Sequence, residues 1–96
     1  MTSAMNIDFL FDGPAEAATV IALAHGAGAP MDSPFMNAIA GQLGAAGIRV
    51  ARFEFPYMAK RRVDGKRRGP DRADVLLACW RDVTERLRGP ARLFIG

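Results

Sequence analysis

Residues 20–31 read VIALAHGAGAPM, an apolar, strand-forming run that passes directly into a loop of glycine and alanine. A buried strand, a loop of small residues and then a helix leave main-chain N–H groups unpaired at the carboxyl end of the strand. Such groups stabilise negative charge, either that of a bound phosphate or that of the oxyanion formed during acyl transfer. A plain turn between a strand and a helix is a third interpretation, so the neighbouring elements have to distinguish the three.

Strands and helices alternate on both sides of this stretch. The hydrophobic pattern predicts four strands, at 7–11, 19–24, 48–53 and 91–95. It predicts two helices, at 34–46 and 71–88, and a polar loop at 56–69. The order β-β-α-β-α-β predicts an α/β fold with an open, mainly parallel sheet and flanking helices. We expect the last three strands to be parallel neighbours and the first to lie towards one edge.

The predicted helices carry recognisable end signals. Ser33-Pro34 is typical of a helix start, because the hydroxyl can accept a hydrogen bond and proline fits the first helical position. Gly47 is expected to end that helix, and Asp71 to begin the second one. Cys79 and Trp80 fall on the apolar side of the second helix, which predicts that both are core residues.

Composition limits the class of protein. The chain has 96 residues, of which 50% are hydrophobic and 24% charged, as in a small folded domain or a piece of a larger one. A single cysteine fits a reducing compartment, and no signal peptide is visible. The longest apolar run, 17–24, is too short to cross a bilayer. We therefore expect a cytoplasmic protein without membrane association.

The net charge of +3 has a local origin. Six of the thirteen basic residues lie between positions 60 and 69: Lys60, Arg61, Arg62, Lys66, Arg67 and Arg68. Because no aromatic residues are interleaved with them, the pattern does not favour a nucleic-acid site. A solvated loop, or a surface that attracts an anionic substrate, would account for this cluster.

A dinucleotide-binding turn is one reading of the glycine loop. Gly26 and Gly28 follow a strand, and Glu54 ends the next strand, where a carboxylate could hold a ribose hydroxyl. The third glycine position of that motif is Met31, however, and the helix is expected to begin only near Ser33. A pyrophosphate needs a helix start within the glycines, so a Rossmann-type half-domain is the weaker alternative.

Three segments resemble a known family: LAHGAGAPMDSPFM at 23–36, RVARFEFPYM at 49–58 and GKRRGPDR at 65–72. They are similar to the α/β-hydrolases of the dienelactone-hydrolase-like branch related to testis-expressed protein 30. The resemblance implies that residues 1–96 are the N-terminal part of an incomplete α/β-hydrolase domain, ending just before a Gly-x-Ser-x-Gly nucleophile elbow. It implies a serine hydrolase acting on an ester, lactone or similar small-molecule acyl bond, without metal or cofactor. With its triad outside these residues, the chain is expected to be inactive alone.

The resemblance also suggests roles for individual residues. The main-chain N–H groups of Ala27 and Gly28 would donate to the oxyanion, supported by His25 and Gly26. Since this fold orders its triad as Ser, acid and His, His25 is not expected to be the base. Tyr57 would line the pocket, because it leaves its strand at the same edge of the sheet.

The basic cluster is open to two functional readings. Its arginines, Arg61, Arg62, Arg67 and Arg68, could steer an anionic substrate towards the loop. The alternative is a non-catalytic α/β-hydrolase-like module that uses the basic residues as a contact surface for a partner. A serine elbow downstream would favour the enzyme, and its absence would favour the module.

Overall fold

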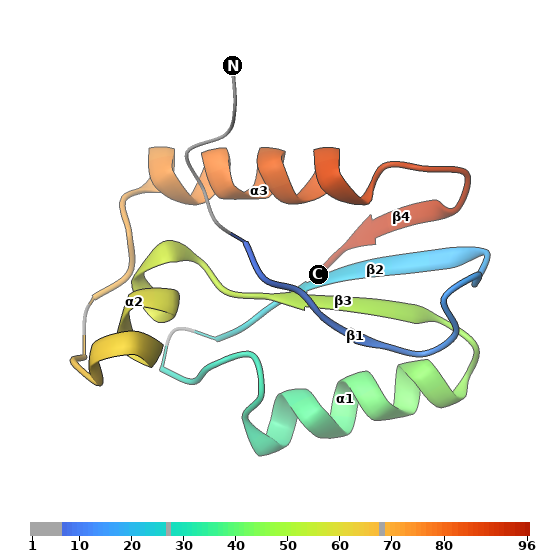
Figure 1. Cartoon of the computed structure of the whole chain (residues 1–96), viewed down its shortest axis with the longest axis horizontal. Coiled ribbons are helices and arrows are strands. Elements are labelled where there is room, and N and C mark those ends of the chain that lie inside the picture. Colours follow the sequence, from blue (N-terminus) through green and yellow to red (C-terminus); the bar gives the residue numbers. More distant parts are fainter. Residues whose placement is uncertain (1–6, 27, 68) are drawn as a thin grey trace.

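The structure, a computed structural model, describes residues 7–26, 28–67 and 69–96. Four strands form one sheet: β1 (Leu10–Asp12), β2 (Thr19–Ala24), β3 (Arg49–Phe53) and β4 (Arg92–Ile95). Their order is β1-β3-β2-β4, with β2 parallel to both β3 and β4, and β1 antiparallel to β3 at the edge (Figure 1). The predicted fold class, the parallel neighbours and the edge position of the first strand are confirmed.

Helices lie on both faces of the sheet (Figure 1). They are α1 (Pro34–Ala45), α2 (Pro56–Asp64) and α3 (Ala73–Leu87). The α3 face holds the main apolar core, in which Cys79 and Val83 pack on Ala22 and Phe53, and the Phe53 and Trp80 rings meet edge to face. The burial of Cys79 confirms that it is a core residue. Strand β2 lies between β3 and β4 in the sheet.

The start of α1 is the one that the sequence predicts. Ser33 occupies the N-cap, its hydroxyl accepts a hydrogen bond of 3.3 Å from the Met36 N–H, and Pro34 is the first helical residue. After the helix, Gly47 adopts a φ of 91°, a left-handed conformation that favours glycine. The cap fixes where the loop after β2 ends, and so how α1 leaves the sheet edge.

The predicted polar loop at 56–69 is wrong over its first part, because residues 56–64 form α2. Pro56 starts the helix, Tyr57 and Met58 are buried, and lysine and arginine are good helix formers. The helix stops at Gly65, which has a φ of 72°. The observed order is therefore β-β-α-β-α-α-β, and part of the basic cluster lies on a helix.

The predicted start of the second long helix is also corrected. This helix, α3, begins at Ala73 and has Arg72 at its N-cap position, without a side-chain cap. Asp71 instead accepts a hydrogen bond of 2.9 Å from the N–H of Tyr57 in α2. The carboxylate therefore serves a different helix from the one that its position in the sequence suggests.

The turn after β1 and helix α1 approach each other through two glycines. Gly13 has a φ of 81°, and a Cβ atom at this position would collide with the carbonyl oxygen of Ile48. A Cβ atom on Gly44 would lie 2.9 Å from the Gly13 nitrogen. Backbone meets backbone here, so α1 lies close against the sheet.

Among the residues that the structure describes, no helix is both long and apolar enough to span a membrane.

Candidate functional site

The parallel strands β2, β3 and β4 end on the same side of the sheet, which we call its C-terminal edge. The loop 25–33 leaves β2 at this edge. The end of β4 lies directly beside it: the Ala24 N–H donates to the Gly96 carbonyl oxygen over 3.0 Å, and the Gly96 N–H donates to the Ala22 oxygen over 2.9 Å. Ligands of open parallel sheets bind at this edge. A residue placed after Gly96 would begin next to the loop.

His25 is buried at the start of the loop. Its Nε2 accepts a hydrogen bond of 3.2 Å from the Phe55 N–H, and its Nδ1 lies 2.6 Å from the Gly26 carbonyl oxygen. Because Nε2 accepts, these bonds assign the proton to Nδ1, which donates it to Gly26. Both ring nitrogens of the neutral imidazole are therefore engaged. His25 joins the loop to the end of β3 and has no free nitrogen to move a proton.

The glycines of the loop are not demanded by the fold. Gly26 and Gly28 are exposed, have no left-handed φ, and a Cβ atom on either would meet nothing within 4 Å. An alanine would fit at both positions. Without side chains, Gly26 and Gly28 let a molecule approach the main chain closely. Ala27, predicted with Gly28 as an oxyanion donor, lies outside the described residues.

Two side chains from β3 and its end hold the middle of the loop at Met31. The Met31 N–H donates to Glu54 Oε2 over 3.1 Å, and its carbonyl oxygen accepts from Arg52 Nη1 over 3.1 Å. Arg52 is buried, and its guanidinium also donates to both carboxylate oxygens of Asp12 and to Asn37. Arg52 therefore ties β1, α1 and the loop together.

Helix α2 holds the loop from the other side. Arg61 Nη1 donates to the Gly28 carbonyl oxygen over 3.3 Å. Arg62 forks onto Asp32, with distances of 3.0 and 3.3 Å, and onto Glu54, with distances of 2.6 and 3.0 Å. Its hydrogen bonds to Glu54 and Asp32 raise the pKa of Arg62. The same hydrogen bonds lower the pKa of Asp32, and they also lower that of Glu54, against the opposing effect of burial.

A pocket of about 420 Å³ lies between this edge and α1. Its walls are mainly apolar and include Leu23, His25, Gly26, Phe35, Met36 and Ile39. It would suit the apolar part of a small molecule whose polar group faces the loop. A larger hollow of about 550 Å³, lined by Phe11, Val20, Arg49 and Leu87, lies at the opposite ends of the strands, away from the glycines.

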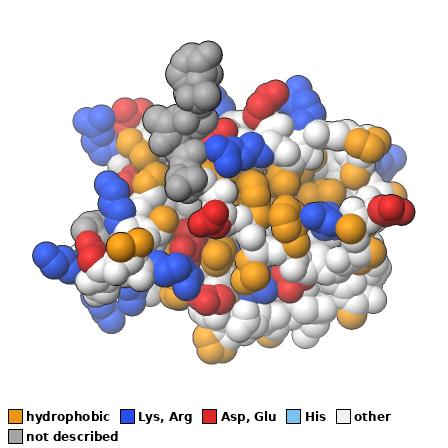
Figure 2. All heavy atoms as spheres, viewed as in Figure 1, with side chains coloured by type: hydrophobic (Ala, Val, Ile, Leu, Met, Phe, Trp, Pro, Cys, Tyr) orange, Lys and Arg blue, Asp and Glu red, His pale blue; other side chains and the backbone are white. Residues whose placement is uncertain are grey.

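The other predicted site residues differ in burial and in their partners. Tyr57 is buried in the core, with its ring edge to face against His25 and its centroid 5.5 Å away. Arg62 is engaged by two carboxylates, whereas Arg67 is exposed. Arg68 lies outside the described residues. In space-filling form the basic side chains gather around α2 (Figure 2).

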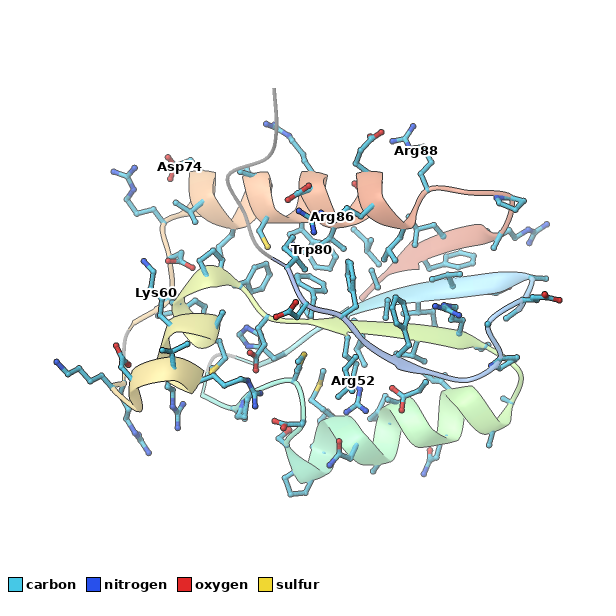
Figure 3. The ribbon with its side chains drawn as sticks, viewed as in Figure 1. Arg52, Lys60, Asp74, Trp80, Arg86 and Arg88 are labelled. Atoms are coloured by element: carbon cyan, nitrogen blue, oxygen red, sulfur yellow. The ribbon has the colours of Figure 1, made fainter. Side chains whose placement is uncertain are left out.

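Sequence reasoning missed Arg52 as a site residue. Figure 3 shows its side chain between the sheet and α1. The available signal was a charged residue inside the apolar strand RVARF, which is rare unless the charge is paired. In the part of the chain that the structure describes, no cluster of three or more metal-ligating side chains occurs.

Comparison with known proteins gives one result. A sequence profile described as alpha/beta hydrolase domain matches residues 17–96, which include all the elements from β2 to β4. No curated protein and no solved structure shows a significant match to the chain.

Proposed function

Because the chain belongs to the alpha/beta hydrolase domain family, we propose that it carries the oxyanion-binding part of a serine hydrolase acting on an ester, lactone or similar acyl bond. The observation that carries this proposal is the pair of exposed glycines, Gly26 and Gly28, at the carboxyl end of the central strand. They lie beside the end of β4, where this family places its nucleophile elbow. The three segments quoted above favour the dienelactone-hydrolase-like branch.

The proposed chemistry divides the work between loop and nucleophile. A serine Oγ attacks the acyl carbon, and the carbonyl oxygen becomes an oxyanion. One N–H from the Ala27–Gly28 part of the loop would donate to this oxyanion, and a second donor would come from the residue after the nucleophile. Each such donor is worth about 10²–10³ in kcat. The apolar pocket beside Met36 would hold the acyl group.

We infer that the nucleophile and the base lie outside the described residues. Ser33 caps α1, and both ring nitrogens of His25 are engaged. The serine, acid and histidine would follow Gly96 in a longer polypeptide, since the family orders them so. We expect the 96 residues alone to be inactive. The single buried Cys79 supports a cytoplasmic location for the enzyme.

Steering of an anionic substrate depends on fewer arginines than the sequence suggests. Arg62 is neutralised by Glu54 and Asp32, so its charge acts mainly within the protein. Arg61 donates a hydrogen bond to the Gly28 carbonyl oxygen. Arg67 follows α2 in the sequence and is exposed. Because Arg61 also holds the loop, the test uses Arg67 alone: Arg67→Gln should raise KM for an anionic ester and leave KM for a neutral ester unchanged, with the difference shrinking at high salt. Equal effects on both esters would contradict steering.

The proposal is tested on the natural polypeptide that contains these residues. We expect a fluorophosphonate probe to label one serine outside residues 1–96, and p-nitrophenyl acetate to be hydrolysed. Gly28→Val should lower kcat because the added side chain would cover the loop amides, without loss of folding stability, since a Cβ atom at this position meets nothing within 4 Å. Gly69→Val is the matched control, since a Cβ there also meets nothing within 4 Å. No labelled serine, together with no hydrolysis above that of a denatured control, would favour the non-catalytic module.

A further inference from the structure

Glu54 carries a carboxylate that is buried beside the glycine loop. It directly follows β3, its side chain is only 6% exposed, and it accepts three hydrogen bonds. One comes from the Met31 N–H in the loop, and the other two come from the guanidinium of Arg62. A buried carboxylate is costly unless it is paired and fully hydrogen-bonded, and Arg62 meets both conditions. These bonds keep the pKa of Glu54 below its usual value despite burial, so the acceptor for Met31 stays ionised.

Arg62 reaches the loop a second time. Its guanidinium bridges Glu54 and Asp32, and Asp32 is the residue after Met31. The Arg62 side chain is 43% exposed and lies on α2, outside the main apolar core. Glu54, at the end of β3, binds the main-chain N–H of Met31, and Arg62, on α2, binds the side chain of Asp32, so one ion-paired unit holds two successive loop residues.

The restraint passes along the backbone to the glycines. Arg52 holds the Met31 carbonyl while Glu54 holds its N–H, so the neighbouring peptide units have fixed orientations. Only Ala29 and Pro30 separate Met31 from Gly28, and the ring of Pro30 fixes its φ. Arg61 then binds the Gly28 carbonyl directly. The backbone from Gly28 to Met31 therefore has little freedom.

From these contacts we infer that Glu54 is a positioning residue, which Arg62 keeps bound to Met31 so that the loop amides are preorganised for a developing oxyanion. This inference rests on the proposed function for its chemical purpose. Fixed donors cost no reorganisation when charge develops, which is why such restraint favours the transition state. The Arg62–Glu54–Asp32 unit is distinct from the fold-forming core, so its loss should loosen the loop and leave the sheet folded.

Amide hydrogen exchange on the full ¹⁵N-labelled chain tests the inference without any activity. In Arg62→Gln we expect protection of the Met31 amide to fall by about tenfold, while the amides of Ala22 and Ala51 in the sheet change by less than about threefold. Glu54→Gln should have the same local effect. Arg62→Lys, which keeps the charge but not the fork, should restore part of the protection. Arg72→Gln is the matched control, because Arg72 is exposed and pairs with Asp74, which is exposed as well.

The outcomes separate the alternatives. A uniform loss of protection in the loop and sheet would mean that Arg62 only stabilises the fold, and unchanged protection at Met31 would mean that the loop does not depend on it; either overturns the inference. In the active polypeptide, Arg62→Gln should lower kcat with little change in KM. A polypeptide without a reactive serine would refute the proposed function but leave the exchange result intact, so the two failures can be told apart.

Discussion

The carboxylate of Asp71 accepts a hydrogen bond of 2.9 Å from the main-chain N–H of Tyr57, fourteen residues earlier in the chain. Tyr57 lies in the first turn of α2, whose own N-cap residue, Phe55, offers no side-chain acceptor. Asp71 therefore acts as a cap supplied from a distant part of the sequence. It connects α2, which holds the glycine loop, to the segment that leads into α3.

Removing this distant cap should destabilise the protein. Asp71→Ala is expected to lower the free energy of unfolding by about 1 kcal/mol, because the Tyr57 N–H loses its acceptor. Urea unfolding followed by circular dichroism would measure the change. Asp74→Ala is the control, since Asp74 is exposed and its ion pair with the exposed Arg72 contributes little. A larger loss in the control than in Asp71→Ala would contradict the capping role.

Two glycines of α1 should respond in opposite directions to alanine. Gly44→Ala is expected to destabilise by about 1–3 kcal/mol, because the new Cβ would lie 2.9 Å from the Gly13 nitrogen and force the turn away from the helix. Gly41→Ala meets nothing within 4 Å and should stabilise by about 0.5–1 kcal/mol. Thermal unfolding of both variants provides the test. If both behaved alike, the close approach at Gly13 would not be the cause.

The acidic partners of Arg62 should make stability depend on pH. The folded-state pKa values of Glu54 and Asp32 lie below their usual 4.5 and 3.8, so the unfolded chain takes up protons first as the pH falls. Their contribution is complete above about pH 5 and is lost as the pH drops through the folded values. The stability gap between wild type and Arg62→Gln should therefore be largest at neutral pH and shrink in acid.

The control for this pH dependence is Arg88→Gln. Arg88 pairs with Glu85 at 3.6 Å, and both side chains are largely exposed. An exposed pair contributes little, so the control gap should be small at every pH. Urea unfolding over a pH series would measure both gaps. A wild-type advantage over Arg62→Gln that stays constant into acid would show that the ion pairs are not its source.

Cys79 should be unreactive in the folded protein. Burial, together with the negative charges of Asp82 and Asp71, raises the pKa of its thiol to about 11. Because the thiolate is the reacting species, Ellman's reagent at about pH 8 should modify Cys79 only as fast as the protein opens. In concentrated guanidinium chloride the reaction should be complete at once. Rapid modification of the native chain would show that the thiol is not buried between α3 and the sheet.

Local pattern and long-range pairing explain what the sequence could and could not predict. The apolar run before His25 and the cap at Ser33 are local signals, and both were sufficient to place the glycine loop at the sheet edge. The pattern at 56–64 did not predict α2, because a run of charged residues is typical of a loop as well as of an exposed helix, and arginine and lysine favour helices. Its start is stabilised from Asp71, which no local window contains.

The same distinction applies to the site. Arg62 is one of the four arginines predicted to steer an anionic substrate, and in the structure its guanidinium binds Glu54 and Asp32, eight and thirty residues away. Arg52 reaches Asp12, forty residues earlier. The types of these residues were visible in the sequence, whereas their partners became known only once β1, β3 and α2 had been brought together. Side-chain pairing across elements is where sequence reasoning lacked information.

The position of β4 has a consequence for the order in which the protein folds. Val20 pairs with Arg49, 29 residues later, and with Leu93, 73 residues later. From the unfolded chain, closing the longer loop costs about 0.8 kcal/mol more in entropy. The β2–β3 pair should therefore nucleate the sheet, and β4 should join late and detach early. Since the contact between Gly96 and Ala24 belongs to that last pairing, the site edge would be assembled in the final step of folding.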